Sequence, residues 1–408
     1  MHAPLAATSV PLAPRMARIA ASPTSVLRAR ARTLRAAGRD VIELSSGDLD
    51  FPTPAHVLAA AAEAAARGET RYTNADGTPE LKDAVRAALR RHNGLDFTRE
   101  EVIVSAGSAQ AMFGAFYATL APGYTVVVPT PCWMPYVEQV RLAYGKPVLL
   151  PCLQNNGFKL RPEELAVALT ERTRWLVINN PVNPTGAVYS ADELSAIAAV
   201  LRAHPHVWVL ADGLYEHIVF DGRRAPTLAE VAPDLRARTL TVSGVAKSYA
   251  MMGWRIGYAA GPAALIAEMT KLQSLTTGCA SSVGQAAALA ALTGPQDVLA
   301  ERAGVLAERR DAFVAMINAC DGLSCTPPAG TFYLLASCAG VIGKRTPEGR
   351  ALASDRDFAA YLLDSADIAV FPGADLGLSP TIRMNFANPL PVLAEAGRRI
   401  KSACAALA

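Results

Sequence analysis

The 408-residue chain lacks the cysteine and histidine patterns of several protein classes. Its seven cysteines are an odd number, and no two of them stand in a CxxC spacing. Its six histidines form no HExxH pattern. A disulfide framework and a zinc site therefore have no support, so we expect no metal. This cysteine usage favours the reducing cytoplasm.

Long apolar runs and an excess of charge of one sign are also missing. No apolar run reaches the roughly 18 to 20 residues that a membrane-spanning helix needs. The net charge is only +3, without basic blocks interleaved with aromatic residues. We therefore expect neither a membrane nor a nucleic acid as partner. In contrast, 51% of the residues are hydrophobic, which suffices for a large core and predicts a two-part globular enzyme.

Short apolar segments alternate with helical stretches through the middle of the chain. This alternation predicts an α/β fold with a mostly parallel, seven-stranded sheet that is flanked by helices. The expected strands are Glu101–Ser105, Thr125–Val128, Pro147–Leu150, Trp175–Ile178, Trp208–Leu210, Thr239–Val242 and Ile256–Ala259. Several are continuous runs of Val, Ile and Leu, as strands buried on both faces require.

Two helices have clear signals at both ends. Thr53-Pro54 is expected to open a helix that ends at Gly68. Thr78-Pro79 is expected to open another that stops at Asn93-Gly94. A capping residue, a proline at the first helical position and a terminal glycine mark such ends.

The character of the sequence changes after about residue 300. A long charged helix over Glu301–Ile317 precedes shorter strands and a closing helix. These strands are expected around Thr331–Leu335, Ile368–Val370 and Thr381–Asn385. We expect a loose N-terminal arm over 1–20, a segment 21–52 that packs with the small domain, a large domain over 53–300 and a small α+β domain over 301–408.

The strongest chemical signal is the segment 243–257, which runs SGVAKSYAMMGWRIG. Its lysine, Lys247, lies between two apolar strands, with small residues before it and Arg255 eight positions after it. Small residues let the backbone approach a bulky ligand. A partly desolvated lysine near another cation has a lowered pKa, which imine chemistry needs. A lone lysine in a loop is usually solvated, but this one belongs to a long patterned segment.

This segment resembles the lysine signature of the class-I aminotransferases, which belong to the fold-type I pyridoxal-phosphate superfamily. The resemblance extends from about Val41 to the C-terminus and is closest to the bacterial aspartate aminotransferase-like subgroup. It implies that Lys247 carries pyridoxal 5'-phosphate as a Schiff base and transfers protons. The implied reaction moves an amino group between an L-amino acid and a 2-oxo acid by a ping-pong mechanism.

The resemblance also assigns residues to the cofactor ring. Residues 180–186, Asn-Pro-Val-Asn-Pro-Thr-Gly, form a rigid loop at a strand end, where open α/β sheets bind ligands. By resemblance, Asn183 in this loop hydrogen-bonds the phenolic oxygen of the cofactor and helps to seat the substrate carboxylate. Asp212 keeps the pyridine nitrogen protonated. Tyr215 hydrogen-bonds the phenolic oxygen, and Ser243 also contacts the cofactor.

Residues 105–110 link a strand to a helix, and the backbone N–H groups at a helix start form a natural anion site. By resemblance, Gly107, Ser108 and Ala109 surround the cofactor phosphate, and Arg255 is its ion-pair partner. Tyr72 matches the tyrosine that reaches the phosphate from a neighbouring subunit. The resemblance therefore implies a homodimer with shared active sites.

The remaining assignments concern the substrate. Trp133 matches the aromatic residue that stacks against the cofactor ring and, like Asn183, borders the substrate. Arg383 has a guanidinium that suits bidentate capture of the α-carboxylate. Gly47 matches the glycine whose backbone meets the substrate.

Several positions depart from the family pattern. Gly213 stands where glutamate is usual, and Asp48-Leu49 replaces Glu-Pro. Ala109 and Ser22 stand where family members that act on aspartate often carry lysine. An unpaired carboxylate in a closed pocket is costly. The sequence therefore weakens the case for aspartate and supports a neutral, aromatic or unusual amino acid at least as well.

Two other functions stay open from the sequence alone. A lyase or decarboxylase acting at Cα or Cβ would share the same lysine, asparagine and aspartate, since a fold does not fix the reaction type. A sensing domain of a regulator is less favoured. Such proteins normally carry a DNA-binding domain ahead of this fold, whereas only a short Ala/Pro-rich arm precedes it here.

Overall fold

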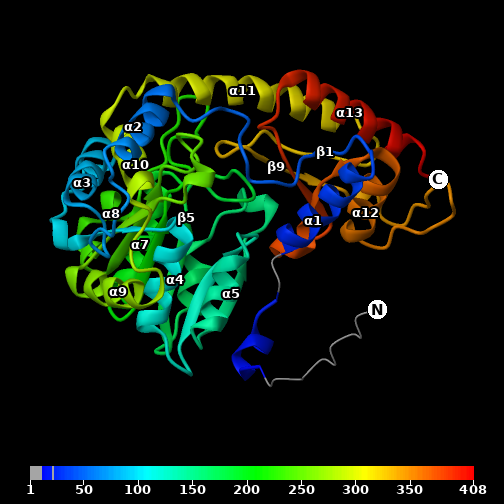
Figure 1. The fold of residues 1–408 in the computed structure, drawn as a ribbon. Coiled ribbons are helices and arrows are strands. Elements are labelled where there is room, and N and C mark those ends of the chain that lie inside the picture. The colour runs from blue at the N-terminus through cyan, green and yellow to red at the C-terminus, as the bar shows by residue number, and fades with distance from the viewer. Residues whose placement is uncertain (1–11, 21–22) are drawn as a thin grey trace, which may run out of the picture.

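The computed structural model describes residues 12–20 and 23–408, which form a larger and a smaller part (Figure 1). Residues 1–11 of the predicted arm and Ser22 lie outside the described residues. None of the helices in the described ranges is long and apolar enough to cross a membrane. The larger part is built on one sheet, and the smaller part contains the C-terminal strands and helices.

The large sheet contains the seven strands that the sequence predicts. In spatial order they are β2 (Val102–Ser105), β8 (Gly257–Ala260), β7 (Thr239–Gly244), β6 (Trp208–Asp212), β5 (Thr173–Asn179), β3 (Thr125–Thr130) and β4 (Lys146–Pro151). Strand β8 runs antiparallel to β2 and β7, and the other neighbouring strands run parallel. The predicted α/β fold with a mostly parallel sheet is therefore confirmed.

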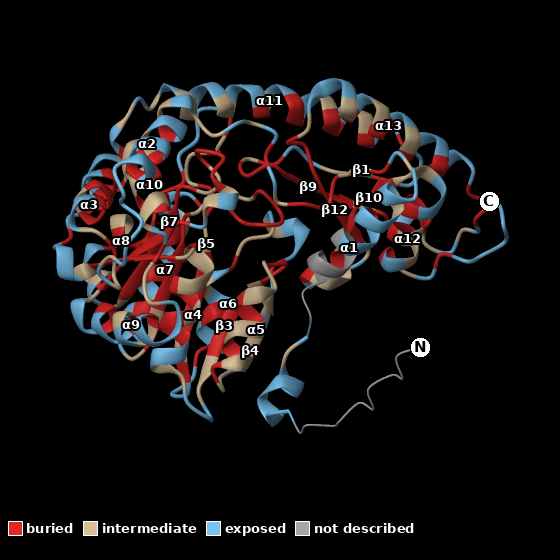
Figure 2. Ribbon diagram, in the orientation of Figure 1, coloured by how far each residue is buried: buried red, intermediate tan, exposed pale blue. Residues whose placement is uncertain are grey.

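Helices cover both faces of this sheet. Side chains along each strand point alternately to the two faces, so one strand contacts helices on both sides. Val126 and Val128 of β3 pack with α4, α5 and α9, whereas Val127 packs with α6, α7 and α8. The strands are accordingly mostly buried, apart from the edge strand β4 (Figure 2). Helices α2, α3 and α10 cover the end of the sheet that contains β2. The helices of the larger part are α2 (Ala55–Ala66), α3 (Pro79–Asn93), α4 (Ser108–Thr119), α5 (Pro135–Leu142), α6 (Pro162–Ala168), α7 (Ala191–Arg202), α8 (Leu228–Val231), α9 (Ala263–Thr276) and α10 (Ser282–Thr293).

The two helix starts behave differently. Thr78 caps α3 by accepting from the N–H of Leu81, and Gly94 ends the helix in the left-handed conformation (φ +66°). Helix α2 begins at Ala55 without a side-chain cap. Thr53, which we expected to cap it, donates to Ala250 O (3.0 Å) and accepts from Trp254 Nε1 (3.1 Å). Thr53 therefore connects the start of α2 to the loop that follows Lys247.

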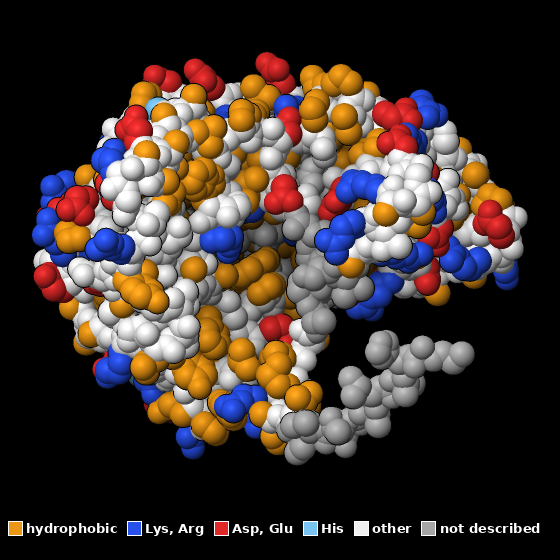
Figure 3. All heavy atoms as spheres, in the orientation of Figure 1, with side chains coloured by type: hydrophobic (Ala, Val, Ile, Leu, Met, Phe, Trp, Pro, Cys, Tyr) orange, Lys and Arg blue, Asp and Glu red, His pale blue; other side chains and the backbone are white. Residues whose placement is uncertain are grey.

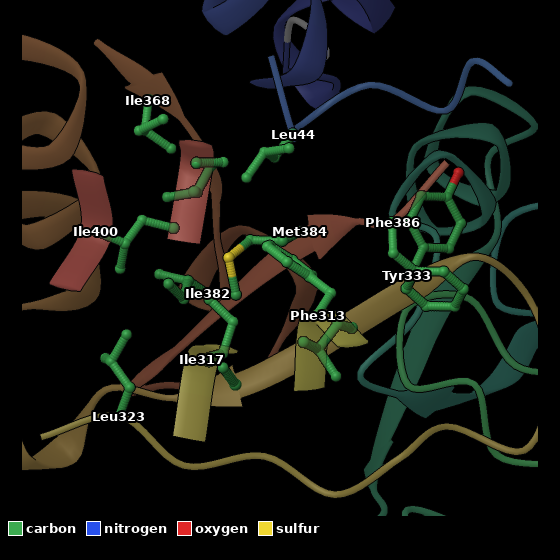
Figure 4. Packing of buried hydrophobic residues seen from close by; sticks show 14 of the residues in the cluster. Leu44, Phe313, Ile317, Leu323, Tyr333, Ile368, Ile382, Met384, Phe386 and Ile400 are labelled. Atoms are coloured by element: carbon green, nitrogen blue, oxygen red, sulfur yellow. The ribbon is translucent and has the colours of Figure 1, made fainter. Parts of the chain in front are cut away.

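The smaller part has a three-stranded antiparallel sheet, with β12 between β11 and β9. Its elements are α11 (Asp297–Asn318), β9 (Tyr333–Ser337), α12 (Asp355–Ala366), β10 (Ile368–Ala369), β11 (Phe371–Pro372), β12 (Thr381–Asn385) and α13 (Leu390–Ala405). Phe313 and Ile317 of α11 belong to the same buried cluster as Ile382 and Met384 of β12 (Figure 4).

The N-terminal segment adds to the smaller part. It forms α1 (Pro23–Ala36) and the short strand β1 (Ile42–Glu43), which pairs in parallel with β10. Of the arm that we predicted to be loose, residues 12–20 are described. Arg18 lies 4.6 Å from the ring centre of Tyr144, and the N–H of Ala20 donates to Glu138 (3.0 Å). These contacts place the described part of the arm against α5.

One buried arginine connects three segments of the chain. Arg309 on α11 pairs with both oxygens of Asp50 (2.7 and 2.9 Å) and also donates to the carbonyl of Ala387. Asp50 follows β1, and Ala387 follows β12. Arg309 thus fixes the N-terminal segment and the end of the small sheet to the same helix.

Replacing Arg309 with methionine is expected to lower the free energy of unfolding by about 1–3 kcal/mol, because it leaves a carboxylate and a buried carbonyl without their donor. The exposed Arg398, which pairs with Glu395 on the surface, provides the control. Arg398→Met should change stability by no more than about 0.5 kcal/mol. Urea unfolding followed by circular dichroism measures both. Equal shifts in the two variants would contradict the role given to Arg309.

Candidate active site

A cavity of ≈ 200 Å³ lies where the carboxyl ends of β5 and β6 and the loop after β7 meet the small sheet. On the face drawn in Figure 3 the surface is hollowed between the two parts, and hydrophobic side chains gather in the hollow. The cavity brings together most residues that the sequence singled out: Gly47, Gly107, Ser108, Ala109, Trp133, Asn183, Asp212, Tyr215, Lys247, Arg255 and Arg383.

Lys247 lies on the loop that follows β7, and its amine donates to the carbonyl of Gly47 (2.7 Å). Burial lowers the pKa of Lys247. The charge of Asp48 and the hydroxyl of Tyr333 act against this lowering, while the positive charges of Arg383 and Arg255 add to it. A neutral amine is a nucleophile, whereas an ammonium is not.

Asp212 ends β6 as a buried carboxylate. Its oxygens accept hydrogen bonds from the hydroxyl of Tyr136 and from the N–H of Leu214 (3.0 Å). Burial raises the pKa of Asp212, while these two hydrogen bonds act in the opposite direction. A positively charged group in the cavity beside Asp212 would favour its ionised form.

A chain of side chains links the large sheet to the small sheet across the cavity. The hydroxyl of Tyr215, just after β6, is 3.5 Å from Asn183 Nδ2 and 3.3 Å from the hydroxyl of Tyr333. Asn183 Oδ1 in turn accepts from Arg383 Nη1 (3.2 Å). Arg383 comes from β12, is buried, and also donates to the carbonyl of Ser45 (2.7 Å). Four polar side chains from different segments therefore hold each other in place.

The start of α4 and Arg255 form a positively charged corner of the cavity. Gly107 caps α4 with φ +87°, and a Cβ at this position would lie 2.4 Å from Arg255 Nη2. Only glycine therefore allows the guanidinium to approach the helix start so closely. Arg255 itself adopts the left-handed conformation (φ +56°), which is unusual for a residue with a side chain. Free N–H groups and a guanidinium together suit a phosphate.

Two of the predicted site residues do not line the cavity within one chain. Ser243 belongs to β7, and its hydroxyl donates to Glu216 Oε1 (2.9 Å) rather than facing the cavity. Tyr72 is 95% exposed and borders a separate hollow formed by α2, α10 and the segment around Arg71. A tyrosine this exposed is available to a second subunit.

Gly213, which stands where glutamate is usual in the family, has room for a side chain. A Cβ on Gly213 would lie 3.7 Å from Val242 O, which is an ordinary contact distance. The structure therefore offers no steric reason for glycine at this position.

Two tyrosines that the sequence analysis missed line the cavity. Tyr136 on α5 donates to Asp212, and burial raises the pKa of Tyr136 well above its ordinary value, so it remains a donor. Tyr333 approaches Tyr215. In the sequence, Tyr333 is indicated only as part of the predicted strand Thr331–Leu335. Alternate residues of a strand point to the same face of its sheet, and in the folded chain Tyr333 shares this face with Arg383.

Comparisons with known proteins show which family this chain belongs to. The model of the family "Aminotransferase class I and II" matches residues 39–397. The chain is 50% identical to an aspartate aminotransferase of Rhizobium meliloti (strain 1021) over 96% of each chain. It is 46% identical to an aspartate/prephenate aminotransferase of Cereibacter sphaeroides over 96% of this chain and 98% of that one. The crystal structure of an aspartate aminotransferase from Rhizobium meliloti superposes with a TM-score of 0.94 at 49% identity and covers 97% of this chain and 99% of the other.

Replacing Lys247 with methionine is expected to stabilise the cofactor-free protein, because a buried amine is costly to keep charged. The gain should depend on pH. Between its lowered folded-state pKa and the unfolded value of about 10.4, the lysine is protonated only in the unfolded chain, so wild-type stability rises with pH. The advantage of Lys247→Met should therefore be largest at low pH and shrink as the pH approaches about 10.4.

Urea unfolding midpoints at pH 6, 8 and 9.5 would measure this trend. The exposed Lys271, which pairs with Glu268, provides the control, since Lys271→Met should show no such pH dependence. A Lys247→Met advantage that stays constant over this range would contradict the lowered pKa.

Proposed function

Since the chain belongs to the class I and II aminotransferase family and catalyses pyridoxal-phosphate-dependent transamination, we propose that the cavity around Lys247 is where it binds the cofactor and exchanges the amino group. The observation that carries this proposal is the convergence of a buried amine, a buried carboxylate and an anion site on one cavity. No finding favours the lyase or decarboxylase that the sequence left open.

The groups in the cavity fit pyridoxal 5'-phosphate one by one. The amine of Lys247 suits covalent attachment of the aldehyde. Asp212, a buried carboxylate held by Tyr136, suits a protonated ring nitrogen, which would compensate for its burial. Gly107 and Arg255 form a corner that would hold the phosphate.

Three further residues would complete the cofactor site. Tyr215 and Asn183 lie together and would hydrogen-bond the phenolic oxygen. Trp133 lines the cavity edge-on to Tyr136, with ring centres 5.0 Å apart, and would stack against the cofactor ring.

In this proposal Lys247 is both the attachment point and the proton carrier. When bound, the cofactor supplies an electron sink that stabilises negative charge at the substrate Cα. The Lys247 amine takes the proton from Cα and returns it one position away, and its lowered pKa favours the neutral form that this task needs. The loss of one 2-oxo acid and the entry of another complete a ping-pong cycle.

Arg383 would bind the substrate α-carboxylate. It is already held by Asn183 and the carbonyl of Ser45, so little orientational freedom is lost on binding. The backbone of Gly47 lies beside Lys247, since the Gly47 carbonyl accepts a hydrogen bond from the Lys247 amine. The carboxylate and Cα would then be presented directly to Lys247.

We propose L-aspartate as the amino donor and a 2-oxo acid as the acceptor. The names of the similar proteins support aspartate. Ala109 lines the cavity with an uncharged side chain, and Ser22 lies outside the described residues. Recognition of a distal carboxylate by this chain would therefore rely on donors other than a lysine at position 109.

The assembly, the compartment and the division of the chain are also proposals. The exposed Tyr72 supports a homodimer in which this residue completes the phosphate site of the other subunit. A cytoplasmic location agrees with the free cysteines of the described chain. A large domain over 53–300 and a small domain over 301–408, packed with 21–52, would place the cavity at their junction.

Asp212→Asn is expected to lower kcat by about 100-fold or more, because an amide cannot supply the charge that keeps the ring nitrogen protonated. The exposed Asp234, which pairs with Arg202, provides the control. Asp234→Asn should leave kcat unchanged. Steady-state kinetics with saturating amino acid and oxo acid test both variants, and a fully active Asp212→Asn enzyme would overturn the assignment.

A screen of amino donors tests the substrate proposal. With 2-oxoglutarate as the acceptor, kcat/KM for L-aspartate is expected to exceed that for L-alanine by about 10-fold or more, since a recognised distal group is commonly worth that factor. L-Phenylalanine and L-glutamate complete the donor series, and prephenate serves as a second acceptor. A higher kcat/KM for alanine or phenylalanine than for aspartate would refute an aspartate enzyme.

A further inference from the structure

Tyr333 lies at the point where the small sheet meets the cofactor cavity. It is the first residue of β9, its side chain is 2% exposed, and it lines the cavity with Lys247 and Arg383. No role in the cycle proposed above requires it. Both its ring and its hydroxyl nevertheless contact residues to which that cycle gives a role.

The ring of Tyr333 supports Arg383. In the small sheet Tyr333 pairs with Asn385 and Leu335 pairs with Arg383, so Tyr333 and Arg383 are diagonal neighbours on one face. The guanidinium carbon of Arg383 lies 4.4 Å from the ring centre of Tyr333. On the other side of β12, Phe371 pairs directly with Arg383, and its ring centre is 4.9 Å away. The guanidinium is therefore flanked by two aromatic rings, which attract a cation and limit its movement.

The hydroxyl of Tyr333 reaches the cofactor side of the cavity. It is 3.3 Å from the hydroxyl of Tyr215. A Cβ on Gly47 would lie 2.8 Å from this hydroxyl and 3.4 Å from the Lys247 amine, so the hydroxyl and the amine border the same small space. Glycine at position 47 keeps that space open.

The direction of the hydrogen bond between the two tyrosines follows from proton counting. A tyrosine hydroxyl has one proton to donate. If Tyr215 donates this proton to the phenolic oxygen of the cofactor, Tyr215 must accept from Tyr333. A hydroxyl that accepts a hydrogen bond becomes a better donor, because hydrogen bonds in a chain polarise one another.

We propose that Tyr333 is a positioning residue with two separable actions, which rest on the roles proposed for Tyr215 and Arg383. Its ring, together with Phe371, holds Arg383 in the orientation that binds the substrate carboxylate. Its hydroxyl donates to Tyr215 and strengthens the hydrogen bond that Tyr215 makes to the cofactor.

Two substitutions separate these actions. Tyr333→Phe keeps the ring and removes the hydroxyl. The visible absorbance of the bound cofactor is expected to change with pH. Tyr333→Phe should raise the midpoint of this change by about half to one pH unit, because the phenolic oxygen retains more negative charge next to the proton held at Lys247. The KM for the amino acid should change less than twofold. Tyr333→Leu removes both groups and should also raise this KM by about 3-fold to 10-fold.

Phe371→Leu tests the ring action without touching Tyr333. It should raise the KM for the amino acid and leave the absorbance change at the wild-type pH. Tyr361→Phe is the matched control, since it removes another buried tyrosine hydroxyl, which donates to Ala403 O (3.0 Å) away from the cavity. This control should alter neither the KM nor the absorbance titration.

Tyr215→Phe and Arg383→Lys, measured in parallel, distinguish a failure of the inference about Tyr333 from a failure of the roles proposed for Tyr215 and Arg383. If Tyr215→Phe shifts the absorbance titration and Arg383→Lys raises the KM, while Tyr333→Phe and Tyr333→Leu behave like wild type, the inference about Tyr333 is overturned and the proposed function stands. If Tyr215→Phe and Arg383→Lys also behave like wild type, the roles proposed for these two residues fail.

Discussion

The hydrogen bond from the Lys247 amine to the carbonyl of Gly47 joins the two parts of the molecule at its chemical centre. Lys247 follows a strand of the large sheet, whereas Gly47 follows the short strand that pairs with β10 in the smaller part. A buried amine needs an acceptor, since an unsatisfied polar group in the interior is costly. The N-terminal segment therefore borders the cavity at Gly47, and the pair of Asp50 with Arg309 fixes its path a few residues later.

The order of polar groups across the cavity would place the proposed cofactor and the proposed substrate against different sides of it. Asp212 and Tyr136 lie on the large-sheet side and offer a buried acid with a fixed donor. Arg383 lies on the small-sheet side and keeps its charge between two aromatic rings. Tyr215 and Asn183 lie between them and contact both sides. A shift of the smaller part would therefore move Arg383, the proposed substrate contact, relative to Asp212, the proposed cofactor contact.

Most of the fold could be predicted because the seven strands of the large sheet are short apolar runs with clear boundaries. The two-residue strands β1 and β11 have no such pattern, since their pairing is decided by distant partners. Lys247 and the positions around Asn183 and Asp212 lie in local motifs, so the sequence indicates them. Tyr136 and Tyr333 lie in none, because their contacts with Asp212 and Tyr215 arise only in the folded chain. Ser243 differs from both groups: it is close to Lys247 in the sequence, but as a residue of β7 it donates to Glu216 in the folded chain.

The pairing of β1 with β10 also has a consequence for the order of folding. Ile42 and Glu43 leave the ribosome long before their partners, Ile368 and Ala369, have been synthesised. The large sheet uses only residues between Val102 and Ala260, so it can assemble before the C-terminal third exists. The segment around β1 is thus fixed only after the much later strand β10 has been made. Because this segment carries the carbonyl that accepts from Lys247, the nascent chain completes the candidate active site only at that stage.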